Sequence, residues 1–419
     1  MDLDSDSPGA PLFCPPCYSL DPAIDETRLS LSPLTGTRPL PTGIFTKGCS
    51  SATVILYDQE PNTTVPCYGR GSYLRGSLLL DRDLSNICQV SAKLQARMEV
   101  TTSESGIMVT KFLNETLLLW SASASSSTSS CPASLSFTFR LPTSVQLGGV
   151  VGPLPPSYGA KFNGYPALFA QSAYILTISI TRSGKLLSRT KTISIPLEYI
   201  PQTRPPRVML SSRGCFFASL RAMPEEWDQT SFIMRARSDS PLAPIQCQVF
   251  SPSVKVFGLA DTIPLHLQMC GDLASLREFI LPCRVGDSAP TVRAYLTRMT
   301  SVVYRDRTTW RTQRIGEGHF RAVPPEVNFD DLECECDEHP KFDCEPQAQV
   351  LDWRGEVRCS PGVTVGGFRA LAVSVKDFIT IEVTPPRIMM QGKAKASPLM
   401  TVQHAIPIRL TTDSFVEPA

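Results

Sequence analysis

The chain has little histidine, almost no excess charge and no long apolar segment. Four histidines in 419 residues leave little material for histidine-rich metal centres or histidine-based catalysis. Forty Lys and Arg against 39 Asp and Glu argue against a nucleic-acid binder, which usually carries a basic excess. No stretch approaches the roughly 18 apolar residues of a membrane-spanning helix. The first ten residues, MDLDSDSPGA, are acidic where a secretory signal is basic, so we expect a cytoplasmic protein with mostly reduced cysteines.

The short motifs of common enzymes are also missing. The sequence contains no G-x-S-x-G, no Gly-rich phosphate loop and no H-E-x-x-H. His266 follows the polar positions of an alternating stretch, which predicts a solvated or hydrogen-bonded surface histidine. We therefore expect a protein that is not an enzyme and holds no cofactor.

Alternation of apolar and polar residues is the strongest positive signal. Between Cys88 and Val100 seven apolar residues alternate with six polar ones, which is typical of a half-buried strand. The same period recurs at 135–141, 174–180 and 193–199, and again beyond residue 244. Proline makes up 37 of the 419 residues, about 9% against a usual value of about 5%. The pattern predicts an all-β fold of two tandem β-sandwiches.

Changes of composition divide the chain into five segments. We expect a disordered Pro/Ser-rich tail, a first sandwich, a linker with a short helix and a Pro-rich hinge, a second sandwich, and a short C-terminal tail. An acidic, Cys-rich loop interrupts the second sandwich at 326–352. The predicted bounds are 1–42, 43–201, 202–243, 244–413 and 414–419.

The order of these landmarks resembles the arrestin family, specifically fungal arrestin-like proteins of the α-arrestin type with arrestin N-terminal and C-terminal domains. The stretches that carry the resemblance include VPCYGRGSYLRGSLLLD (65–81), GPLPPSYGAKFNGYPALFAQSAYILTISITRSG (152–184), FSPSVKVFGLADTIPLHLQMCG (250–271) and FRALAVSVKDFITIEVTPP (368–386). The resemblance implies two immunoglobulin-like sandwiches and a trafficking adaptor for cytoplasmic segments of membrane proteins, with peripheral membrane association only. Such adaptors recruit a HECT-type ubiquitin ligase through PPxY motifs, for endocytosis and sorting at the plasma membrane or endosomes.

Two PPxY motifs fit that role unequally. Pro15, Pro16 and Tyr18 lie in the predicted tail, where a peptide ligand for a WW domain is accessible. Pro155, Pro156 and Tyr158 form the weaker match, because they lie in a predicted turn where Tyr158 is expected to pack. Only about nine residues follow the last predicted strand, although many α-arrestins carry their motifs in a long C-terminal tail. The alternative is an arrestin-fold sorting scaffold, similar to retromer components, that recruits no ligase.

Two further groups of residues leave alternatives open. Cys334, Cys336, His339 and Cys344 have the composition of a zinc site, but their acidic neighbours favour a solvated loop. Arg182, Lys185, Arg189 and Lys191 cluster around one predicted hairpin and would suit acidic or phosphorylated cargo, or anionic lipid headgroups. A solvated hairpin tip explains the same cluster.

Overall fold

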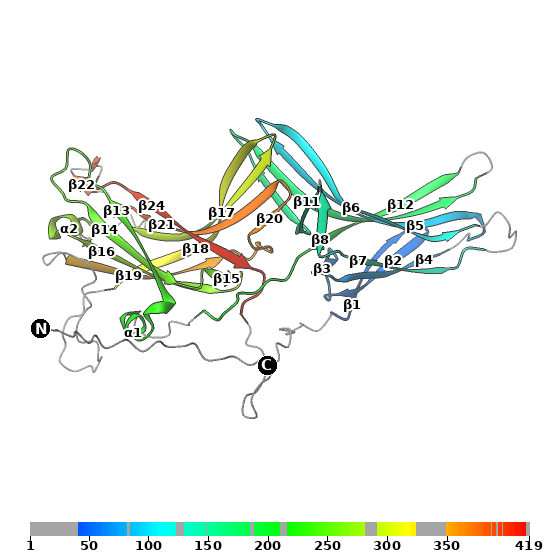
Figure 1. Cartoon of the computed structure of the whole chain (residues 1–419), viewed down its shortest axis with the longest axis horizontal. Coiled ribbons are helices and arrows are strands. Elements are labelled where there is room, and N and C mark those ends of the chain that lie inside the picture. The colour runs from blue at the N-terminus through cyan, green and yellow to red at the C-terminus, as the bar shows by residue number, and fades with distance from the viewer. Residues whose placement is uncertain are drawn as a thin grey trace, which may run out of the picture. The chain divides into compact units, whose positions relative to one another are not determined.

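The computed structural model describes residues 41–81, 84–122, 130–147, 149–184, 188–209, 216–280, 291–323, 349–386, 388–390, 393–395 and 397–415. All of them belong to one compact unit, Leu40–Glu417, and the other unit, Met1–Pro39 with Pro418–Ala419, lies outside them. Strands dominate the described residues, so the predicted all-β fold is confirmed (Figure 1). Two hydrophobic cores define two β-sandwich lobes, which we call the first and the second lobe.

The first lobe encloses its core between two sheets. One sheet has the order β1-β2-β4-β7, and the other has the order β3-β12-β11-β5-β6 with β10 beside β11. The pairs are antiparallel except for the short parallel pair of β3 with β12. The strands are β1 (Gly43–Cys49), β2 (Ala52–Gln59), β3 (Cys67–Tyr68), β4 (Tyr73–Leu80), β5 (Ile87–Thr102), β6 (Gly106–Ser121), β7 (Ser134–Arg140), β10 (Tyr158–Phe162), β11 (Leu168–Arg182) and β12 (Arg189–Tyr199), with a small hairpin of β8 (Ser144–Leu147) and β9 (Val150–Pro153) and a 3-10 turn η1 (Leu84–Asn86).

Period-2 alternation places the core of the first lobe. In β5 alternate residues from Val90 to Val100 are buried, and Leu94 lies opposite Leu176 of β11. In β11 every second residue from Leu168 to Ile180 is buried in the same way. Because side chains of a strand point alternately to its two faces, these residues form one apolar layer against β2, β4 and β7.

The second lobe is built from one continuous sheet rather than two separate ones. Its order is β13-β14-β16-β19-β18-β17-β21-β24-β15, with β20 beside β21, and a single core lies within it. The strands are β13 (Trp227–Met234), β14 (Ile245–Pro252), β15 (Val256–Gly258), β16 (Thr262–Gly271), β17 (Val292–Tyr304), β18 (Arg307–Val323), β19 (Gln349–Cys359), β20 (Phe368–Ala370), β21 (Val373–Val383) and β24 (Val402–Thr411), with a separate hairpin of β22 (Ile388–Met390) and β23 (Lys393–Lys395).

Glycines allow close packing where β18 passes from one neighbour to the next. A Cβ atom on Gly316 would lie 2.2 Å from the carbonyl oxygen of Arg358, and one on Gly318 would lie 2.3 Å from that of Glu356. The register of β17 and β18 also shifts beside this point, between Leu296 and Thr297. A bulge of this kind increases local twist, which helps one sheet to curl around a core.

The segment 202–243, predicted to be a linker, contributes structure to the second lobe. It holds α1 (Phe216–Ala222), near the predicted short helix, and the 3-10 turn η2 (Pro224–Glu226). It also holds β13, which pairs with β14 from Trp227 to Met234, so a linker throughout this segment is wrong. As an edge strand, β13 buries only Met234 fully, and its sequence pattern is correspondingly weak. The other described helix is α2 (Leu273–Ile280).

Candidate functional site at the seam between the lobes

The β17–β18 hairpin of the second lobe packs directly on the first lobe. Val302 of β17 and Val373 and Val375 of β21 belong to the hydrophobic core of the first lobe, although they lie in strands of the second. These three side chains share one face of the sheet, because Val302 lies directly opposite Val373 and Val375 follows two residues later. We call this contact between the two lobes the seam. It extends the apolar core of the first lobe.

Tyr158 connects the two lobes at the centre of this seam. Its hydroxyl lies 2.7 Å from the hydroxyl of Thr300 in β17. Its ring meets that of Phe368 edge-on, with the ring centroids 5.2 Å apart. Burial raises the pKa of the Tyr158 hydroxyl, which keeps it protonated and able to donate. A residue that the sequence marked as part of a PPxY motif is thus a packing residue with a partner 142 positions away.

The prolines of this second motif are equally occupied. Pro155 and Pro156 are buried, and the Tyr174 hydroxyl donates to the carbonyl oxygen of Pro155. Ser157 forms two hydrogen bonds with Tyr199, from its backbone nitrogen to the carbonyl oxygen and from the Tyr199 nitrogen to its hydroxyl, both 2.8 Å long. A WW domain needs a free polyproline segment, so binding here would require this part of the seam to open.

A buried ion pair lies next to Tyr158. Arg298 of β17 and Asp377 of β21 form a bidentate contact, with Nε to Oδ1 at 2.7 Å and Nη2 to Oδ2 at 3.2 Å. Their side chains are only 4% and 0% exposed. Because the two charges neutralise each other in an apolar layer, neither can be removed without leaving the other unpaired. The pair fixes the register of β17 and β21 behind the seam.

A groove of about 700 Å³ opens at the seam. It lies beside the segment that leaves β12 and links the two lobes, residues 200–209, which we call the connector. The connector is held here by Thr203, whose backbone nitrogen donates to the Thr412 hydroxyl at 2.8 Å and whose carbonyl oxygen accepts from the Asp413 nitrogen at 3.0 Å. Most of the wall is apolar and comes from the connector, the β9–β10 turn, β20, β21 and β24. The apolar lining residues include Leu154, Pro156, Tyr199, Pro201, Phe368, Phe378, Pro407 and Ile408.

Four cations surround this apolar wall. Arg70, Arg369, Lys376 and Arg409 line the groove and are exposed. Among the residues that the structure describes, none of the four forms an ion pair. The one acidic residue of the lining, Asp377, is already paired with Arg298. The groove therefore combines an apolar wall with unpaired positive charge, which suits an extended ligand that carries acidic groups.

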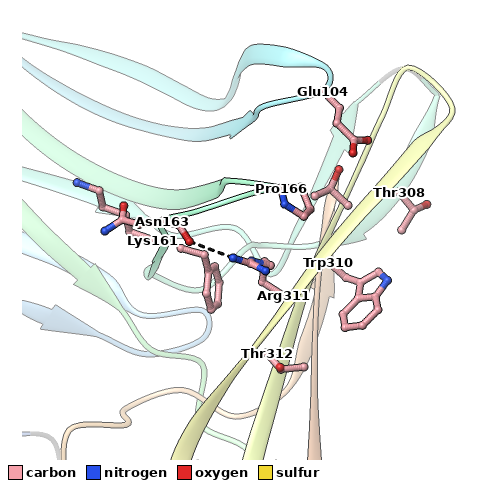
Figure 2. Close-up of a pocket in the computed structure, with 10 residues that line it drawn as sticks. Glu104, Lys161, Asn163, Pro166, Thr308, Trp310, Arg311 and Thr312 are labelled. Atoms are coloured by element: carbon pink, nitrogen blue, oxygen red, sulfur yellow. Dashed lines mark hydrogen bonds between the residues drawn. The ribbon is translucent and has the colours of Figure 1, made fainter.

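A second hollow, of about 620 Å³, lies where the β17–β18 hairpin meets two turns of the first lobe (Figure 2). Arg311 of β18 reaches across it and donates to the carbonyl oxygen of Asn163 at 3.0 Å. Glu104, Lys161 and Thr309 also line this hollow. Its mixture of one acid and two cations around exposed backbone gives no arrangement typical of a catalytic centre.

The basic hairpin β11–β12 is only partly a free cation cluster. Arg182 lies directly opposite Arg189, and the Lys191 ammonium donates to the hydroxyls of Ser50 and Ser51 at 2.6 and 3.1 Å. Lys185 lies outside the described residues. Burial by itself would raise the pKa of the nearby Cys49 thiol. Backbone hydrogen bonds at Ser51 and Ala52 and the charge of Lys191 outweigh burial, so this pKa is lowered. The described cations thus lie at one end of the sandwich, with Lys191 engaged.

His266 is buried, so the prediction of a surface histidine is wrong. The residue is 2% exposed, its ring stacks on Phe216 of α1 at 3.9 Å, and its Nε2 lies 2.9 Å from Oδ1 of Asp352. Its Nδ1 has no hydrogen-bond partner among the described residues. Alternation predicted a solvated outer face for β16, but α1 covers that face at this point. Because helix α1 comes from a distant segment, the strand's own sequence held no signal for it.

The remaining predicted sites lie outside the described residues. These are the first PPxY motif with Pro15, Pro16 and Tyr18, and the Cys/His group of Cys334, Cys336, His339 and Cys344. Within the described part of the chain, no group of three or more His, Cys, Asp or Glu is arranged to hold a metal ion. No helix in that part is long and apolar enough to cross a membrane.

The four groove cations are functional candidates that sequence reasoning missed. Arg70, Arg369, Lys376 and Arg409 come from three separate regions of the sequence, so no local pattern groups them. Only the pairing of β21 with β24 and the course of the connector bring them to one place.

Comparison with solved structures finds a distant likeness. No family model and no curated protein sequence matches the chain. Among the solved structures that match is Spo0M, a sporulation control protein from Bacillus subtilis, with 12% sequence identity. The match covers 64% of this chain and 91% of that chain, with a TM-score of 0.23.

Proposed function

We propose that the protein is a non-enzymatic, arrestin-like adaptor that binds acidic or phosphorylated cytoplasmic segments of membrane proteins. The observation that carries this proposal is the groove with an apolar wall and the four exposed cations Arg70, Arg369, Lys376 and Arg409. The resemblance of the sequence to arrestin-like proteins and the two sandwich lobes support the same role. The adaptor would act in the cytoplasm and be recruited to the plasma membrane or endosomes with its cargo.

The groove favours an extended peptide over a small molecule. Its walls come from strands of both lobes and from the connector, and its polar groups come from separate segments of the chain. Charge-assisted hydrogen bonds from arginine to carboxylate or phosphate supply affinity and orientation, while the apolar wall takes the side chains between the acidic groups. The lining holds four cations and one carboxylate, Asp377, which is already paired with Arg298. An acidic peptide is therefore complementary to the groove in charge.

Arg409→Gln is expected to weaken binding of an acidic peptide about tenfold or more, because one charge-assisted hydrogen bond of roughly 1.5–3 kcal/mol is lost. Fluorescence anisotropy with a labelled, extended peptide rich in glutamate and phosphoserine measures this change. The matched control is Arg321→Gln, an exposed arginine of β18 outside the groove. Equal affinity of the Arg409 variant and the wild type would remove the groove as the peptide site.

We further propose that the tail recruits the WW domains of a HECT-type ubiquitin ligase through Pro15, Pro16 and Tyr18. Two prolines in a polyproline segment present their rings at low entropy cost, and the tyrosine occupies a neighbouring pocket. Pro155, Pro156 and Tyr158 do not offer the same ligand, because these residues are packed and hydrogen-bonded at the seam.

Tyr18→Ala is expected to reduce WW-domain binding by about thirtyfold or more, as for removal of a central aromatic anchor. Titration of WW domains against the intact chain by calorimetry measures it. Tyr158→Ala is the matched comparison and is expected to leave this binding unchanged. Undiminished binding by the Tyr18 variant, or no binding by the wild type, would favour a sorting scaffold without ligase recruitment.

A further inference from the structure

Three turns from two lobes meet at one edge of the seam. The β5–β6 turn contacts the β17–β18 turn, with the Ser105 hydroxyl 3.5 Å from the carbonyl oxygen of Tyr304. The backbone of Ser103 donates to the carbonyl oxygen of Ala167 in the β10–β11 turn at 3.2 Å. Arg311 bonds the same β10–β11 turn at Asn163, as Figure 2 shows. We call this meeting point of the three turns the crest.

The crest exposes several large apolar side chains to solvent. Trp310 and Val303 of the β17–β18 hairpin are 57% and 52% exposed, and Tyr165 of the β10–β11 turn is 79% exposed. Ile107, the second residue of β6, is exposed as well, and so is Leu371, whose neighbour Ala372 accepts a hydrogen bond from the backbone nitrogen of Val303. Single exposed apolar residues are ordinary, but several on adjoining turns mark an interaction surface.

The hairpin itself has two apolar faces, of which only one is covered. Val302 and Thr309 are buried on the face toward the first lobe. Val303 lies opposite Thr308, and Trp310 lies opposite Ser301, so Val303 and Trp310 project from the other face. In Figure 2 the Trp310 ring points away from Arg311 and Asn163. No described segment of the chain covers the outer face at Trp310 and Val303.

Positive charge lies at the tip of the hairpin beside these side chains. Arg305 and Arg307 flank Asp306 and all three are exposed, so the tip carries a net charge of +1. Arg305 stacks over the Tyr304 ring at 5.0 Å.

The turn at the tip has a rare backbone conformation. Arg305 and Asp306 have φ values of 51° and 60°, in the left-handed region where a two-residue hairpin turn favours Asn and Gly. Non-glycine residues adopt this backbone conformation only rarely, and such residues cluster at functional sites. Here the turn places one arginine and one aspartate at the end of the hairpin, with Arg307 directly after them.

We propose that the crest is a docking surface for an anionic lipid bilayer, with Trp310 and Val303 entering the interfacial region and Arg305 and Arg307 contacting the headgroups. Tryptophan and tyrosine rings settle at the level of lipid headgroups, and each nearby arginine strengthens binding to anionic lipid. A narrow tip with aromatic and basic side chains fits such a surface. Insertion into the groove of a partner protein would instead require an apolar face longer than this tip. The lipid contact is independent of the peptide groove and holds whether or not that groove binds cargo.

Flotation of the full chain with vesicles tests this surface. Binding to vesicles of phosphatidylcholine and phosphatidylserine is expected to exceed binding to phosphatidylcholine alone and to fall with salt. Arg305→Gln/Arg307→Gln is expected to weaken it roughly thirtyfold, and Trp310→Ala/Val303→Ser about tenfold or more. Ile233→Ser, which replaces an exposed apolar residue of β13 far along the sheet from β18, is the matched control and should bind as the wild type.

Tryptophan fluorescence supplies a readout at the residue itself. Trp310 is more exposed than Trp120, Trp227 or Trp353, so a blue shift on adding anionic vesicles that disappears in Trp310→Phe places this ring in the bilayer. Arg409→Gln should keep vesicle binding even where it loses peptide binding. Vesicle binding that is indifferent to phosphatidylserine, or equal in the crest and Ile233 variants, would overturn the proposal. So would self-association of the wild type that the crest variants abolish, because a second copy would then be the occupant.

Discussion

Asp377→Ala is expected to lower the free energy of unfolding by about 3–5 kcal/mol, the largest single effect that the structure predicts. The substitution leaves the Arg298 guanidinium charged and without its bidentate partner in a layer where its side chain is 4% exposed. Among the described residues, Asp377 is the one carboxylate paired with Arg298. Urea unfolding at neutral pH, followed by circular dichroism and tryptophan fluorescence, measures the loss.

Two comparison variants separate charge from packing. The double variant Arg298→Met/Asp377→Leu removes both charges and is expected to recover most of the stability, because apolar side chains of similar volume suit the site. Glu356→Ala removes one member of an exposed pair with Arg358 at 3.2 Å and is expected to cost less than about 1 kcal/mol. A loss in Asp377→Ala no larger than in Glu356→Ala would contradict the buried-pair interpretation.

The ion pair also has a role in positioning the seam. Asp377 and Arg298 lie beside Thr300, which accepts or donates the hydrogen bond with Tyr158, and beside Gly367, where an added Cβ atom would lie 3.1 Å from Asp377 Oδ2. Movement of β17 relative to β21 would therefore disturb both the lobe contact and the wall of the groove. We expect Asp377→Ala to weaken acidic-peptide binding in addition to its effect on stability.

Local alternation was sufficient to predict the first lobe. The seven apolar residues between Cys88 and Val100 alternate in the sequence and are the buried or half-buried face of β5. Such strands can be predicted from the sequence because one face of each is buried along its whole length, which makes every second residue apolar. β13 lacked this signal, since an edge strand buries few side chains and its sequence, WDQTSFIM, has little period-2 character.

The candidate site was much less predictable than the fold. The sequence identified Tyr158 as a member of a PPxY motif in a turn, but its partner Thr300 is 142 residues away and follows from topology alone. The groove cations likewise meet only after β20, β21 and β24 have paired. For His266 the alternation in β16 was misleading. It predicted that the polar face of the strand is solvated, but Phe216 of α1 covers that face at His266. Tertiary structure brings these residues together from distant parts of the chain, so no fixed sequence spacing connects them and no motif could predict the site.

Above pH 9 the free energy of unfolding is expected to fall steeply with pH. Burial raises the pKa of the Cys247 thiol from 9.0 to about 12, a change that a backbone hydrogen bond at Met234 only partly offsets. The unfolded chain therefore loses this proton near pH 9 while the folded chain keeps it. A folded pKa above the unfolded value gives stability that is complete below pH 9 and is lost between pH 9 and 12, at about 1.4 kcal/mol per pH unit.

Buried tyrosines add to the same loss from about pH 10. Burial raises the pKa of Tyr174, which donates to Pro155, and of Tyr68, whose hydroxyl has no partner among the described residues. Urea unfolding at pH 8, 9, 10 and 10.5 with a reductant measures the slope. Cys247→Ala should flatten it from pH 9, and Tyr174→Phe only from pH 10, because each removes one proton from the difference between unfolded and folded states. Slopes unchanged in both variants would mean that these groups titrate in the folded protein as they do in water, and the packing of both lobes around them would have to be looser than the structure describes.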